Sequence, residues 1–185
     1  GVHLRQGVTT TRSGKWGLRI APCPEKGRKD SLRYLKPIVG TVPEDIEFDA
    51  FGEYLDLVES RTLPLNFGMH VGNGTLRMAA KGFASGRLSA GEVATVHEYL
   101  RDAVAAGAFG VSTGLSYSPE NTYDPDGIVE ALQPIPGAGI PLATHLRGVG
   151  TLLVDSVRVV IAIAESLEAP RPLSPYKRSG PPPCG

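Results

Sequence analysis

Helical hydrophobic spacing is clearest in the middle of the chain, after Ser89. The apolar positions of this stretch repeat every three or four residues: Val93, Val96, Leu100, Ala103 and Val104. Such spacing places them on one face of a helix. Ser89 with Glu92 three residues later has the pattern of a capping box, and Gly107 suits the end of a helix. The pattern therefore predicts a helix between Ser89 and Gly107.

The same spacing predicts a helix on each side of this one. The first covers residues 50–60, and Asp49 is placed to cap it. The second is long and runs from Leu152 to Leu167. Its inward face should consist of five apolar residues: Leu153, Val157, Val160, Ile161 and Ala164.

Prolines limit two shorter helical stretches. Residues 32–35 are predicted to form a single helical turn ahead of Pro37. Residues 126–132 should form a short helix that Pro134 ends early. Asp124 is expected to act as a turn and cap residue in front of that helix.

Four short runs rich in apolar or β-branched residues lie between these helices, at 6–17, 65–71, 108–115 and 140–150. Alternation of strands with helices predicts an α/β fold with a parallel sheet. A closed eightfold barrel needs about 250 residues. The 185 residues here can supply only part of one.

Polar side chains follow the apolar run that begins at Ile140. His145 and Arg147 come directly before two glycines, at the end of a parallel strand where α/β proteins bind ligands. His145 could be a metal ligand, a general base or a structural residue. Arg147 could hold a substrate carboxylate or pair with an acid of a loop. Ser112 and Thr113 are expected to satisfy backbone groups at a strand end.

Composition narrows the function further. There are 19 basic and 19 acidic residues, a balance that argues against nucleic acid as the main partner. The longest nearly apolar run, 157–164, contains Arg158 and is too short to cross a membrane. No signal peptide is recognised, and Cys23 and Cys184 form neither a metal motif nor a disulfide framework. A cytoplasmic protein without a membrane partner is therefore expected.

Five segments together resemble the N-acyl-D-amino-acid deacylases (D-aminoacylases) of the amidohydrolase superfamily. In chain order they are Gln-Gly-Val-Thr-Thr at 6–10, Ile-Ala-Pro at 20–22, Gly-Thr-Leu-Arg at 74–77, Gly-Val-Ser-Thr-Gly-Leu at 110–115 and Ala-Thr-His-Leu-Arg at 143–147. The resemblance implies a (β/α)8 TIM-type barrel. Residues 1–170 would form an incomplete part of it, about strands 2 to 6, and 171–185 a proline-rich C-terminal segment.

The resemblance also implies a chemistry: zinc-dependent hydrolysis of the amide of a small N-acyl amino acid. His145 stands at the position of a metal-ligating His. Lys177, Arg147 and Tyr117 stand at or beside positions that contact the substrate. The family's catalytic Asp and its first-strand His-x-His have no counterpart in this sequence, so no catalytic residue is assigned.

Three departures from the family pattern weaken the expected zinc site. Gly-Lys-Trp-Gly at 14–17 replaces a Gly-Asn-Cys-Gly whose Cys binds metal, and Pro175-Tyr176 replaces a His-His pair. Gly-Asn-Gly at 72–74 replaces Gly-His-Gly. Neither Trp16 nor Pro175 offers a lone pair to zinc. The sequence thus predicts a hydrolase relative, a fragment with impaired or no activity. The alternatives are a non-catalytic relative that binds a small carboxylated ligand and an unrelated α/β binding domain.

Overall fold

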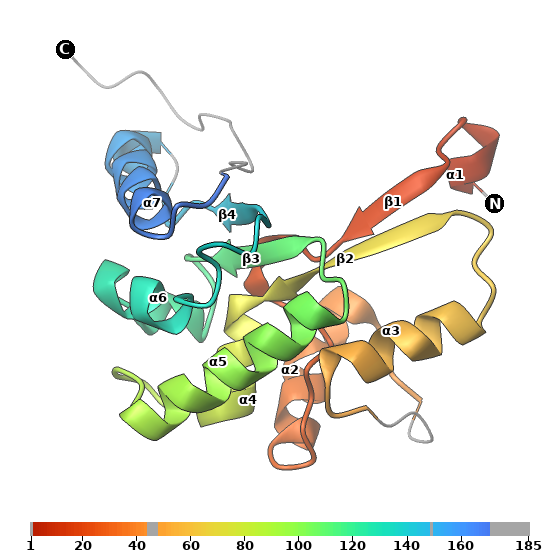
Figure 1. Cartoon of the computed structure of the whole chain (residues 1–185), viewed down its shortest axis with the longest axis horizontal. Coiled ribbons are helices and arrows are strands. Elements are labelled where there is room, and N and C mark those ends of the chain that lie inside the picture. Colours follow the sequence, from red (N-terminus) through yellow and green to blue (C-terminus); the bar gives the residue numbers. More distant parts are fainter. Residues whose placement is uncertain (1, 44–47, 149, 171–185) are drawn as a thin grey trace.

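The computed structural model describes residues 2–43, 48–148 and 150–170. Its centre is a four-stranded parallel sheet in which the strands lie in sequence order (Figure 1). Each strand pairs in parallel with the next. The strands are β1 (Thr10–Ser13), β2 (Asn66–Gly72), β3 (Gly110–Gly114) and β4 (Leu142–His145). This topology confirms the predicted α/β class and is consistent with part of a TIM-type barrel.

Helices fill every connection between the strands, as parallel strand order requires. A short α1 (Val2–Arg5) precedes β1, and α2 (Arg28–Val39) and α3 (Phe51–Ser60) lead to β2. Next come α4 (Asn73–Lys81) and α5 (Ala90–Ala105) before β3, α6 (Pro125–Ala131) before β4, and α7 (Leu153–Ser166) after it. Three 3-10 turns complete the order: η1 (Lys15–Gly17), η2 (Glu120–Thr122) and η3 (Gly150–Leu152).

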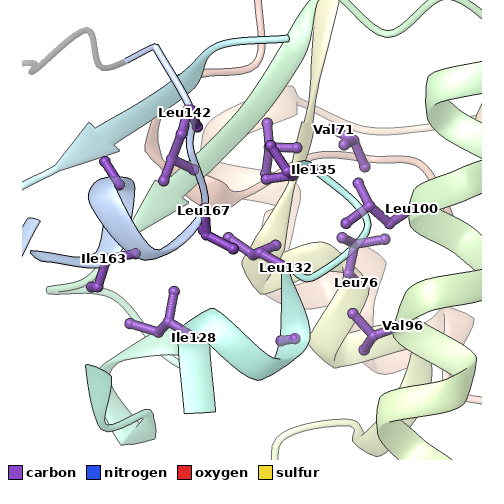
Figure 2. Packing of buried hydrophobic residues seen from close by; sticks show 14 of the residues in the cluster. Val71, Leu76, Val96, Leu100, Ile128, Leu132, Ile135, Leu142, Ile163 and Leu167 are labelled. Carbon is purple, nitrogen blue, oxygen red and sulfur yellow. The ribbon is translucent and has the colours of Figure 1, made fainter. Parts of the chain in front are cut away.

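The main hydrophobic core lies between one face of the sheet and the helices (Figure 2). Val71 of β2 and Leu142 of β4 face Leu100 of α5 and Leu167 at the end of α7, and all four are buried. Residues next to these core positions point to the other face, because side chains alternate along a strand. On that second face η1 packs against β2, β3 and β4.

The predicted caps of two helices are confirmed. Ser89 Oγ accepts a hydrogen bond from the backbone N–H of Glu92, and the Glu92 carboxylate accepts one from the N–H of Ser89. Asp124 caps α6 by accepting the N–H of Gly127 at 2.7 Å. This helix ends at Ala131, ahead of Pro134 as expected.

Two predictions about the first helices are wrong. Asp49 is not the cap of α3: Ala50 holds that position, and the Glu53 carboxylate accepts the N–H groups of Asp49 and Ala50. The Asp49 side chain instead pairs with Arg28. In addition, 32–35 is not an isolated turn, because α2 continues through Pro37. Pro37 removes one N–H donor from the last turn of this helix, which ends two residues later at Val39.

Two further differences concern α4 and α7. No helix is predicted at 73–81, because Asn73-Gly74 suggests the end of a strand. The structure nevertheless has α4 there, and the first six residues of this helix are all buried. In α7, Ile161 is only half-buried, whereas Ile163 lies in the core. Among the described helices none is both long and apolar enough to cross a membrane. Residues 171–185, with Pro175, Lys177 and Cys184, lie outside the described part.

Candidate functional site

His145 is the last residue of β4, so the predicted position at a strand end is confirmed. Its Nδ1 lies 3.2 Å from the carbonyl oxygen of Leu146 and 3.3 Å from Ser116 Oγ, and its Nε2 lies 3.4 Å from Tyr117 Oη. A proton on Nδ1 suits the Leu146 carbonyl and leaves the Nε2 lone pair toward Tyr117. Partial burial lowers the pKa of His145, which favours the neutral imidazole.

Trp16 and Tyr117 complete an aromatic group around His145. The ring centroid of Trp16 lies 6.0 Å from that of His145 and 6.3 Å from that of Tyr117. The rings of Tyr117 and His145 are 5.0 Å apart. Trp16 nevertheless remains 48% exposed. It therefore forms a partly exposed wall beside the histidine.

Two glycines shape the η1 turn that presents Trp16. Gly14 and Gly17 have φ angles of 106° and 73°, and a Cβ at either position would overlap His70 or Glu120 respectively. Trp16 itself has a φ of 77°. This left-handed conformation is unfavourable for a bulky side chain. The turn is anchored by the N–H of Gly17, which donates to Ser112 Oγ at 3.2 Å.

Arg147 contacts backbone carbonyls of the η2 region. One Nη donates to the Asn121 oxygen at 3.0 Å and the other to the Tyr123 oxygen at 2.9 Å. No ion pair of Arg147 with an acid is found in the described part of the chain. The structure thus brings His145 and Tyr117 together and places Arg147 on the adjoining turn.

Glu120 is a buried acid near this site that sequence reasoning missed. It is 1% exposed, and its carboxylate accepts the N–H of Gly114 at the end of β3. Burial raises the pKa of Glu120 to about 8, and the hydrogen bond from the N–H of Gly114 offsets this only in part. A Glu that follows Ser-Pro in a polar loop is typical of a surface residue, so the sequence carried no signal for its burial.

A second buried charge, Arg77 of α4, lies close by. It is fully buried and donates one Nη to the carbonyl oxygens of Ala84 at 3.0 Å and Gly86 at 2.7 Å. Its guanidinium also lies 4.6 Å from the centroid of the Tyr123 ring. Arg77 thereby ties the loop after α4 to the η2 region.

The sequence matches no family model, but similar proteins are found. The chain is 29% identical over 182 residues to the D-aminoacylase of Alcaligenes xylosoxydans xylosoxydans, covering 98% of this chain and 37% of that protein. It is 32% identical over 178 residues to the N-acyl-D-aspartate deacylase of the same organism, covering 96% and 35%. The chain therefore spans about a third of the length of these relatives.

Solved structures give the same result. The crystal structure of a D-aminoacylase, described as defining a subset of amidohydrolases, superimposes with a TM-score of 0.80 at 27% identity and covers 96% of this chain and 36% of that one. The fold also matches the N-acyl-D-glutamate deacylase of Bordetella bronchiseptica, with a TM-score of 0.76 at 22% identity over 91% of this chain and 34% of that one.

The parallel α/β sheet of this chain superimposes on part of a D-aminoacylase that is described as an amidohydrolase. Over nearly its whole length the chain is a homologue of D-aminoacylases and related N-acyl-D-amino-acid deacylases. This confirms the family resemblance of the sequence.

The relatives use metal: one D-aminoacylase structure is described by its binuclear metal center, and the glutamate deacylase was solved with zinc. The described residues of this chain do not fit such a centre. They contain no group of three His, Cys, Asp or Glu side chains that could hold a metal ion. Around His145 the neighbours are instead Trp16, Tyr117 and Ser116, and an indole is not a zinc ligand.

Proposed function

We propose that this protein is a hydrolase-type relative of the N-acyl-D-amino-acid deacylases whose own amide hydrolysis is impaired or absent. The observation that carries the proposal is Trp16, which lies against His145 where the family pattern has a metal-binding Cys. Catalytic zinc sites normally use three protein ligands. No group of three His, Cys, Asp or Glu side chains in the described part of the chain could hold a metal ion, so we expect no tight zinc binding.

In this proposal the retained residues recognise the substrate. Neutral His145 and the hydroxyl of Tyr117 lie 3.4 Å apart and can contact an amide or a carboxylate. Lys177, which lies outside the described residues, is assigned to the substrate carboxylate by resemblance alone. Arg147 contributes by holding the η2 region and thereby the loop that carries Tyr117.

Zinc analysis and hydrolysis assays on one protein preparation test this proposal. After dialysis against zinc-free buffer, we expect much less than one zinc per chain. We also expect no release of amine from N-acetyl-D-alanine, N-acetyl-D-aspartate or N-acetyl-D-glutamate, with or without added zinc. Near-stoichiometric zinc, or turnover that a chelator abolishes, would contradict the proposal that amide hydrolysis is impaired.

Stereoselective binding tests the retained recognition. In NMR titrations, N-acetyl-D-amino acids should shift the His145 imidazole signals, and the L-enantiomers should shift them less. The His145 imidazole signals are assigned as those that are missing from the spectrum of the His145→Gln variant. Equal effects of the two enantiomers, or none from either, would contradict descent of this site from a D-amino-acid deacylase.

A further inference from the structure

We propose that a cleft beside Trp16 binds an amphipathic carboxylate, a molecule with an aliphatic or aromatic group attached to a carboxylate-bearing end. The cleft has a volume of about 550 Å³, which is within the size range of small-molecule sites. N-acyl amino acids with a large acyl group are such molecules. The inference that N-acyl amino acids are the natural ligand rests on the proposed function. The inference that the cleft binds an amphipathic carboxylate rests only on the residues that line it.

The apolar part of the cleft comes from residues of three separate segments. Trp16 and Leu18 belong to the η1 region, Ile38 to the end of α2, and Tyr117 to the loop after β3. Leu18 is supported from behind by Leu35 and Met78. Trp16 and Ile38 are 48% and 47% exposed, so they leave apolar surface open on the same cleft. An acyl chain that covers this surface removes it from water, which favours binding.

All charged side chains that line the cleft are positive. Arg12, Lys15 and Arg19 line it, and no Asp or Glu does. None of the three forms an ion pair within the described residues. Burial lowers the pKa of Arg19, and its Nε is buried without a hydrogen-bond partner among these residues. One Nη of Arg19 donates to the Lys15 carbonyl oxygen at 3.3 Å. The positive charges of Lys15 and Arg19 that line the cleft favour a ligand carboxylate through charge-assisted hydrogen bonds.

The cleft and the His145 site share two side chains. Trp16 and Tyr117 line the cleft, and their rings also lie within 6.0 Å and 5.0 Å of the His145 ring. A ligand in the cleft therefore touches the same wall as the histidine. Because Trp16 is the only tryptophan of the chain, its fluorescence reports on this place alone.

Titration of the Trp16 fluorescence with N-octanoyl-D-alanine, below its micelle concentration, tests the inference. N-acetyl-D-alanine should bind at least about tenfold more weakly, because six methylenes fewer are buried. The neutral N-octanoyl-D-alanine amide should also bind more weakly, since it lacks the carboxylate. Equal affinities of the octanoyl and acetyl compounds, or of the acid and its amide, would overturn the proposal.

Matched variants locate the binding. Lys15→Gln should weaken octanoyl-alanine binding about threefold to tenfold, as expected for a charge-assisted contact. Ile38→Gln should weaken the octanoyl compound and leave acetyl-alanine unchanged. The controls are Lys29→Gln, an exposed cation of α2 that does not line the cleft, and Val154→Gln, an exposed apolar residue of α7. Circular dichroism verifies that each variant is folded. Losses as large in the controls would refute the cleft.

Failure of this inference and failure of the proposed function give different results. If N-octanoyl-L-alanine binds as well as the D-form and depends on Lys15 and Ile38, the cleft stands and the deacylase origin of the site is contradicted. If N-acetyl-D-amino acids act on His145 stereoselectively while the Lys15 and Ile38 variants change nothing, the proposed function stands and the cleft is refuted.

Discussion

Glu120 is a carboxyl group that protein encloses completely, with the N–H of Gly114 as a hydrogen-bond donor. Burial raises its pKa to about 8 from an ordinary value of 4.5. The folded state therefore holds this proton over a range in which the unfolded state has lost it. Its contribution to stability is fully present below about pH 4.5 and is lost as the pH rises through about 8.

A Glu120→Gln variant tests this linkage. The amide stays neutral, so the free energy of unfolding should no longer fall between about pH 5 and 8. At pH 9 the variant should be more stable than the parent by about 2–4 kcal/mol. Urea unfolding followed by circular dichroism at several pH values measures the difference. The control is Glu98→Gln on the exposed face of α5. An unchanged pH profile in Glu120→Gln would show that Glu120 is ionised in the folded protein at neutral pH.

Single residues show both what the sequence can predict and what it cannot. His145 was found because its position after an apolar run places it at the end of a parallel strand, independently of distant contacts. The burial of Glu120 depends on Gly17, Gly114 and Asn73, which are distant from one another in sequence and meet only in the folded chain. No local pattern specifies such a pocket.

Among the elements, α5 and α4 are opposite cases. Helix α5 was predicted because a capping box, an apolar stripe and a terminal glycine all agree. Helix α4 was missed because Gly72-Asn73-Gly74 is typical of a turn after a strand, and its first six residues, several of them polar, are all buried. Burial of Asn73, Thr75 and Arg77 is specified by tertiary partners such as the Ala84 and Gly86 carbonyls for Arg77.

The η2 turn depends on Arg147, and this gives a prediction about an element. Replacing Arg147 by Ala should lower the free energy of unfolding by about 1–3 kcal/mol, because two hydrogen bonds from a charged group are lost. Arg147→Lys should restore little of it, since an ammonium cannot reproduce the planar fork that reaches the Asn121 and Tyr123 oxygens.

Urea unfolding measures these changes, with Arg158→Ala as the control. Arg158 is exposed on α7, where it forms an ion pair with the equally exposed Asp155, so its loss should have little effect. Full restoration of stability by Arg147→Lys would show that charge, rather than the paired hydrogen bonds, holds the turn.

At the scale of the whole molecule, the parallel order of the four strands places β3 beside β4 (Figure 1). The η1 turn packs against both strands. Alternation of strands and helices predicted this architecture, and the comparisons with the deacylases support it. The fold alone did not predict which side chains surround His145. In this chain Trp16 lies beside His145, whereas related structures are described with zinc or a binuclear metal center.

Zinc affinity, measured by competition with a chromophoric chelator, tests the central claim most directly: the scaffold persists while the metal ligands are missing. Three proteins are compared: the parent, the Trp16→Cys, Pro175→His variant, and the same variant with His145→Ala. Pro175 is chosen through sequence resemblance, as it lies outside the described residues. The parent should bind zinc weakly, the double variant at least about tenfold more tightly, and the His145→Ala form weakly again. Tight zinc binding by the parent, no gain in the double variant, or a gain that survives His145→Ala would contradict the account.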